Sequence, residues 1–114
     1  AAFACKPGPL PESTNRYIEA MHRMHADMDI AYSGDADIDF AKGMVPHHQG
    51  AVDMAEIVLK HGSDPQIRRL AAWIRQQQEL EIGQMTRWLA VRGEAPGSAT
   101  KPRFTRESGA TAEY

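Results

Sequence analysis

Residues 40–61 read FAKGMVPHHQGAVDMAEIVLKH, and they carry the clearest structural pattern in the chain. Its apolar and soft polar side chains recur every three or four residues, which is the spacing of one face of an α-helix. The stripe consists of Phe40, Met44, His47 with His48, Ala51, Met54 with Ala55, Val58 and His61. We therefore predict a helix that begins between Asp35 and Asp37 and ends at His61, with Gly62 as a C-terminal glycine.

Pro46 lies inside this helical pattern, directly before the His47–His48 pair. Proline has no amide hydrogen, so the carbonyl of Lys42, four residues back, loses its usual partner and the helix bends. A proline in a helix interior costs about 3 kcal/mol. That cost beside two histidines indicates a functional turn, whereas a proline in the first turn of a split helix would cost little.

The segments on both sides also have helical periodicity. The first predicted helix begins near Ser13 or Thr14, which are good N-caps, and runs to about Tyr32. Its stripe is Tyr17, Met21, Met24, His25, Met28 and Tyr32. The last predicted helix has Ser63 as its cap, Gln66 completing a capping box, and Gly93 after its final residue near Arg92. Its stripe is Ile67, Leu70, Ile74, Gln77 with Gln78, Glu81, Met85 and Trp88 with Leu89.

The predicted fold class is all-α, an antiparallel bundle of three long helices. No stretch alternates like a strand, and short connections make consecutive helices antiparallel neighbours. Three such helices bury a narrow core, which a homodimer would enlarge into a four-helix or larger bundle. Residues 1–12 hold three prolines and predict an extended arm, residues 13–93 the helical domain, and residues 94–114 a flexible tail.

The composition excludes several classes of function. The 114 residues carry a net charge of -2, which gives no electrostatic case for binding nucleic acid. No apolar run reaches the roughly 18 to 20 residues of a membrane-spanning helix. A single cysteine, Cys5, excludes an intrachain disulfide and a thiolate-only zinc site. Ala2 and Ala4 before it form a pattern like the end of a signal peptide, but no charged region or long apolar run precedes them, so we expect any targeting segment to have been removed.

Methionine and histidine are concentrated in one part of the chain. Ten of the eleven such residues lie between Met21 and His61, and only Met85 falls outside. Core filling calls for Leu, Ile and Val, which the first helix lacks between Met21 and Met28. Thioether and imidazole are neutral ligands that suit Cu(I) and Ag(I). Two facing stripes of Met and His therefore predict a soft-metal site, which Met85 can join.

Other interpretations of the same residues stay open. A methionine stripe on an amphipathic helix is more often flexible core than a metal site. His61 suits a helix C-terminus for its interaction with the dipole, and His22 lies at the edge of its stripe, so both are only additional candidate ligands. Glu19-x-x-His22 is one unit of a di-iron site whose second unit is missing. The acidic run from Asp35 to Asp39 lacks the glycine and the glutamate of an EF-hand.

Residues 44–55, MVPHHQGAVDMA, resemble the hallmark of a family catalogued as domain of unknown function 305, which includes CopM-type copper-binding proteins. The segments from Met21 to Met28 and from Gln78 to Leu89 resemble other helices of that family. The resemblance implies a ferritin-like helical bundle, export to the periplasm or cell surface, and binding of Cu(I) or Ag(I) for copper resistance, buffering or trafficking. Cu(II) is left open as a second oxidation state.

Carried over to this chain, the resemblance implies the metal ligands Met21, Met24, His25, Met28, Met44, His47, His48, Met54 and Met85. Gln78 and Glu81 are expected to orient a ligand, and Asp39 is a further candidate for that role. The expected partners are copper ions, other periplasmic copper proteins and a second copy of the chain. We expect no catalytic residue. The alternatives are a metal-dependent redox enzyme and a structural or partner-binding bundle with a Met-rich core.

Overall fold

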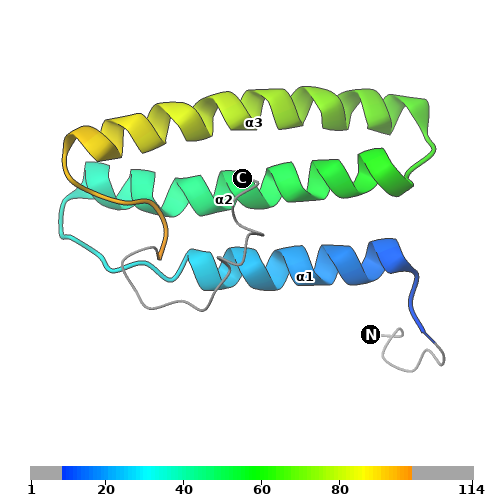
Figure 1. The fold of residues 1–114 in the computed structure, drawn as a ribbon, viewed down its shortest axis with the longest axis horizontal. Coiled ribbons are helices and arrows are strands. Elements are labelled where there is room, and N and C mark those ends of the chain that lie inside the picture. Colours follow the sequence, from blue (N-terminus) through cyan, green and yellow to red (C-terminus); the bar gives the residue numbers. More distant parts are fainter. Residues whose placement is uncertain (1–8, 99–114) are drawn as a thin grey trace.

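The computed structural model describes residues 9–98, which contain three α-helices and no strand. α1 spans Glu12–Asp27, α2 spans Ala36–His61 and α3 spans Pro65–Val91. Figure 1 shows the helices antiparallel and side by side, with α2 in the middle. Within the described residues α2 packs against both neighbours, while no Cα atom of α1 comes within 8 Å of one in α3. The all-α class and the antiparallel order are confirmed, and the three helices form one layer.

The first helix is shorter than predicted. α1 begins at Glu12 without a side-chain cap and ends at Asp27, so the prediction of a helix from Ser13 or Thr14 to Tyr32 is wrong at both ends. Aspartate is a poor helix former and is unfavourable near a helix C-terminus, which explains why the helix ends at Asp27. The chain beyond it buries Ile30 and leaves Tyr32 exposed, so Tyr32 does not extend the stripe.

Two aspartates hold the connection between α1 and α2. Asp35 caps α2, because its side chain accepts hydrogen bonds from two backbone amides of the first turn. The carboxylate of Asp39 accepts from the backbone N–H of Ser33 (2.8 Å), from its hydroxyl (2.9 Å) and from the N–H of Gly34 (3.3 Å). These bonds, led by the one from the Ser33 backbone, lower the pKa of Asp39. The Asp39 carboxylate therefore holds this turn, and its expected role beside a metal ligand stays a prediction.

α2 continues through Pro46 without a break. The carbonyl of Lys42, which the proline leaves without an intrahelical partner, accepts a hydrogen bond from the N–H of Gly97 at 2.8 Å. Gly97 has a φ of +61°, and a Cβ there would lie 3.2 Å from the carbonyl oxygen of Asp27. Glycine is the residue that tolerates both conditions. The first residues of the expected flexible tail thus pack against α2, while residues 1–8 and 99–114 lie outside the described residues.

The buried side chain of Lys42 joins the same region. Its Nζ donates to the carbonyl of Ala31 at 2.9 Å and lies 3.5 Å from Oε1 of Glu94. A buried ammonium group needs such partners, because removing an unpaired charge from water costs on the order of several kcal/mol. The α1–α2 connection and the segment after α3 are therefore both attached to one turn of α2.

The ends of α3 agree only in part with the prediction. Asp64 is the N-cap and accepts from the amide of Ile67 at 2.9 Å, so the predicted Ser63 cap and its capping box are wrong. Gly93, with a φ of +73°, follows the helix end as predicted. Gly62 at the end of α2 is extended, not left-handed, and is needed for space because a Cβ would lie 2.7 Å from the Val58 carbonyl oxygen.

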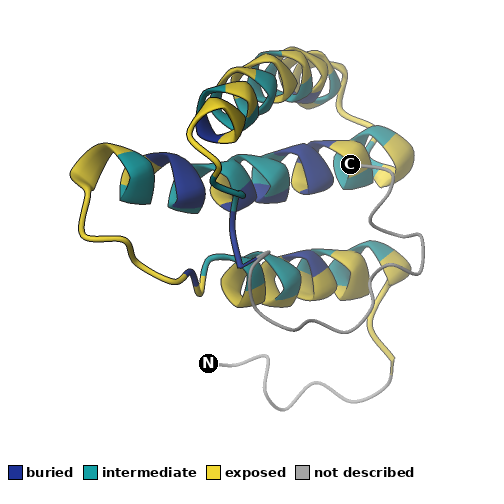
Figure 2. Cartoon of the chain, turned by 60° about the vertical axis from the view of Figure 1, so that its left-hand side comes forward, coloured by how far each residue is buried: buried dark blue, intermediate teal, exposed yellow. Residues whose placement is uncertain are grey.

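The core is narrow and lies mostly along α2 (Figure 2). Its buried apolar residues are Ala20 of α1, Ile30 of the connection, Ala41, Val52 and Ala55 of α2, and Ala71 and Leu89 of α3. Four of these seven are alanines, which bring the helix backbones close together but bury little area each. No helix in the described part of the chain is long and apolar enough to cross a membrane.

Candidate metal centre

An uncharged strip runs along α2 between the sides that face its two neighbours. Gly50 and Asp53 mark the side that faces α1, and His48 marks the side that faces α3. The strip consists of the exposed residues Phe40, His47, Met54 and His61 and the half-buried residues Met44, Ala51 and Val58. We call these seven residues the α2 strip. His47 and Met54 therefore lie on an open face of the layer, with α1 on one side and α3 on the other.

His48 is held by Glu81 across the α2–α3 contact. Nε2 of His48 lies 2.7 Å from Oε1 of Glu81. An ionised carboxylate can only accept, so Nε2 donates and a neutral imidazole keeps a lone pair on Nδ1. Nδ1 is buried and has no hydrogen-bond partner in the described structure. A carboxylate on one ring nitrogen and a free lone pair on the other is the arrangement found in metal-bound histidines.

Two methionines lie near His48 on the helices that carry this pair. Met44 is one turn before His48 on α2, and Met85 is one turn after Glu81 on α3. Because the two helices are antiparallel, both methionines lie on the same side of the His48–Glu81 pair along the helix axes. Met85 lines a cavity of about 480 Å³ together with Phe40, Ala41, Asp37, Gln84 and Trp88. We call Met44, His48 and Met85 the α3-side group.

A second group lies on the α1 side of α2. A Cβ at Gly50 would lie 2.6 Å from Sδ of Met24, so Met24 packs directly on the α2 backbone. Arg23 pairs with Asp53 at 3.2 Å. Because α1 and α2 are antiparallel, this register sets Met28 at the level of His47 and Met21 at the level of Met54. We call these residues the α1-side group, and it consists of Met21, Met24, Met28, His47 and Met54.

The remaining candidates are not brought into either group. His22 and His25 are exposed, and His22, two residues from Met24, points away from α2. His61 is exposed in the last turn of α2, and none of the described hydrogen bonds involves its side chain. Gln78 lies half-buried one turn before Glu81.

No three His, Cys, Asp or Glu side chains within residues 9–98 are close enough to hold a metal ion. This finding concerns sites without methionine. Both groups described above contain thioether sulfur.

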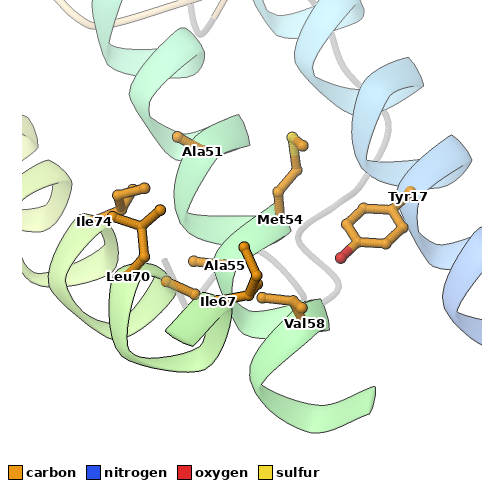
Figure 3. Close-up of a pocket in the computed structure, with 9 residues that line it drawn as sticks. Tyr17, Ala51, Met54, Ala55, Val58, Ile67, Leu70 and Ile74 are labelled. Carbon is orange, nitrogen blue, oxygen red and sulfur yellow. The ribbon is translucent and has the colours of Figure 1, made fainter. Parts of the chain in front are cut away.

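An apolar cavity of about 280 Å³ occupies the other end of the open face. Tyr17 of α1, Met54 and Val58 of α2, and Leu70 and Ile74 of α3 line it. Figure 3 shows Met54 extending between α2 and α1, near the Tyr17 ring. The open face is therefore apolar at this end, and rich in Met and His toward the α1–α2 connection.

Several polar contacts around the site were not predicted. Asp53 is buried and accepts from Gln49 at 3.2 Å as well as from Arg23, which fastens α1 to the middle of α2. The spacing of Gln49 and Asp53, four residues apart in a helix, was a usable signal. Nothing local marks Lys42 as buried, because its partners are 11 and 52 residues away.

Comparison with known proteins identifies a family. Residues 37–113 match the family described as Domain of unknown function (DUF305). Over 49 residues the chain is 37% identical to Uncharacterized protein L153 of Acanthamoeba polyphaga mimivirus, a match that covers 43% of this chain and 32% of that protein. The chain thus spans about a third of the length of this curated relative.

Proposed function

The chain belongs to the domain of unknown function (DUF305) family, and we propose that it is a CopM-like protein that binds Cu(I) outside the cytoplasm. Ag(I) is expected to bind as a mimic. The role would be buffering or trafficking of copper, with no chemical turnover. The single observation that carries the proposal is His48, whose Nε2 is held by Glu81 and whose buried Nδ1 has no partner in the described structure.

The α3-side group is the primary site of this proposal. A buried imidazole nitrogen without a hydrogen bond costs about 1–3 kcal/mol, and a metal ion would remove that cost. Met44 and Met85 offer thioether sulfur at neighbouring turns of the two helices. Neutral soft ligands of this kind favour Cu(I) over Zn²⁺, which prefers thiolate, imidazole and carboxylate. Glu81 would orient the imidazole and increase its basicity.

The α1-side group would provide further binding. Met21 and Met54 are about half exposed, which suits exchange of an ion with a partner protein. Met24 packs against Gly50, so its first role is to join the two helices. The multiplicity of thioethers on one face supports a buffer that holds and passes on copper, since ligand exchange between neighbouring thioethers needs no large motion.

The test is an anaerobic titration of the intact chain with Cu(I) against a chromogenic chelator that competes for it. We expect the wild-type protein to withdraw Cu(I) from the chelator, and His48→Ala and Met44→Ala to lose most of that ability. His22→Ala is the matched control, because it removes an imidazole that points away from α2. Wild-type binding no stronger than that of the His48→Ala variant would reject the proposal and leave a bundle with a Met-rich core.

A further inference from the structure

We propose that a second copy of this chain docks on the α2 strip, and that the two chains share metal sites built from His47 of one chain and His61 of the other. The shared sites rest on the soft-metal binding proposed above. They extend that function by naming the partner, which is the chain itself, and by assigning a role to His61.

The α2 strip lacks charged side chains, as surfaces covered by another protein chain often do. Its seven residues span 22 positions of α2 and include no charged side chain, although four of them are exposed. Phe40 is 62% exposed and Met54 is 53% exposed. A helix face that meets only water normally carries charged residues. A second copy could cover this strip without burying a charge, which is the usual obstacle to self-association.

The two histidines of the strip lie symmetrically about Met54. His47 and His61 each lie seven residues from it, which is about 10 Å along the helix axis at 1.5 Å per residue. A two-fold axis at Met54 that sets α2 antiparallel to its copy places His47 opposite His61 of the partner subunit, and it does so twice. If the two α2 helices cross at about 20°, both His47–His61 pairs stay within the contact between these helices.

His47 and His61 of one chain cannot share an ion, because they are 14 residues apart on a continuous helix, or about 21 Å. If both histidines hold the same metal ion, the second histidine must come from another chain. The two-fold arrangement also brings Met54 of each chain to the axis. A thioether pair would then lie between the two histidine pairs.

The open face is large enough for a stable dimer. With a two-fold axis at Met54, residues 47–61 of α2 overlap with their copy, and the parts of α1 and α3 beside them bring the covered face to roughly 650 Å², at about 1.5 Å per residue and about 9 Å between axes. Stable interfaces of standard size begin at about 600 Å² from each partner. The face also carries the apolar cavity, whose α3 residues Ile67 and Leu70 are about half exposed. Monomers rarely leave such a patch in contact with water.

The experiment measures self-association of the intact chain by sedimentation, with and without one equivalent of silver nitrate. A metal ion bound between two chains stabilises the dimer by mass action. We expect Ag(I) to lower the dimer dissociation constant at least tenfold. His61→Ala should abolish this shift, and His22→Ala should leave it intact. Both substitutions introduce alanine at exposed helical positions, so folding is preserved.

Mixing two variants tests the shared site directly. A dimer of His47→Ala chains, or of His61→Ala chains, lacks one ligand in both sites. A mixed dimer of the two variants has one complete site and one site without either histidine. We expect the equimolar mixture to recover up to a quarter of the wild-type sites, since half of randomly assorted dimers are mixed and each holds one of two sites.

The results separate the two proposals. Full Ag(I) binding with no change in the dimer dissociation constant, or no recovery on mixing, would overturn the shared site and leave the proposed function standing. Absence of any Ag(I) binding would overturn both. Retention of the tenfold shift in His61→Ala would show that another residue links the chains and would reject the assignment of His61.

Discussion

Glu81 is the residue that gives the candidate centre its orientation. It holds Nε2 of His48 at 2.7 Å and so leaves Nδ1 as the free nitrogen. Glutamine has the same shape but a neutral amide, so it can accept the same hydrogen bond without the carboxylate's effect on imidazole basicity. The carboxylate and the amide can therefore be compared without a change in packing.

We predict that Glu81→Gln lowers Cu(I) affinity by about 10- to 100-fold, the usual effect of removing such a partner. The measurement is the chelator competition described above, with the melting temperature as a check of folding. Glu56→Gln is the matched control. Burial and the neighbouring Asp53 charge raise the pKa of Glu56, which lies on the far side of α2 from the α2 strip. Unchanged affinity in Glu81→Gln would argue against His48 as a ligand.

Asp39 should make the stability depend on pH. Its hydrogen bonds to Ser33 and Gly34 lower its pKa below the ordinary value of 3.8. A carboxyl whose folded pKa is depressed adds stability above its unfolded pKa, and this contribution is lost as pH falls through the folded pKa. We predict that Asp39→Asn lowers the melting temperature at pH 7 and weakens its decline below about pH 4. Asp37→Asn, in the same turn, is the control. An equal decrease of the melting temperature in both variants would contradict the prediction.

At the scale of secondary structure, α2 determines how the other two helices pack. Gly50 allows the backbone of α2 to approach Met24 of α1, while Pro46 is tolerated because Gly97 supplies the missing donor to Lys42. Gly43 lies in the same helix, but a Cβ at that position would meet no other atom within 4 Å. The two glycines therefore differ only in their surroundings.

We predict opposite effects for alanine at these two positions. Gly43→Ala should raise the free energy of unfolding by about 1 kcal/mol, because alanine is the better helix former. Gly50→Ala should lower it by about 1–3 kcal/mol, because a methyl group 2.6 Å from Sδ of Met24 displaces that side chain. Urea unfolding followed by circular dichroism measures both. Equal stabilisation by the two substitutions would mean that Met24 moves aside without cost.

At the scale of the whole molecule, α1 is the helix with the least support. Of the other two helices it packs only on α2, and Ala20 is its single buried residue. The Arg23–Asp53 pair is one polar attachment of α1 to α2. Regions with few buried apolar contacts open locally at lower free energy than the rest of the fold. α1 is therefore expected to open before α2 and α3 separate.

We predict that amide hydrogens of α1 exchange faster than those of α2 and α3, and that Arg23→Met increases this difference. Cu(I) or Ag(I) should slow exchange in α1, because Met21, Met24 and Met28 would become ligands. Hydrogen exchange read by mass spectrometry measures all three effects. Protection of α1 equal to that of α3 in the metal-free protein would contradict the prediction. Metal protection confined to α2 and α3 would assign the ion to the α3-side group alone.

Local patterns in the amino-acid sequence were enough to predict three helices, their antiparallel order and the Met and His stripes of the first two. These features follow from local periodicity and short connections, which do not depend on distant residues. Helix ends were less predictable: Asp64 capped α3 where Ser63 was expected, and α1 ended before Tyr32. Neighbouring residues compete for the same cap, and small differences in local energy choose between them.

Which candidate residues meet depends on the packing of the helices. The N–H of Gly97 donates to the Lys42 carbonyl, and Glu81 accepts a hydrogen bond from His48. The carboxylate of Asp39 accepts a hydrogen bond from the Ser33 hydroxyl. The first two join residues that are 55 and 33 positions apart, so no local pattern encodes them. The single layer that leaves the α2 strip exposed is likewise a property of packing. Periodicity predicts that a helix has an apolar side, whereas the space around that side depends on where the other helices lie.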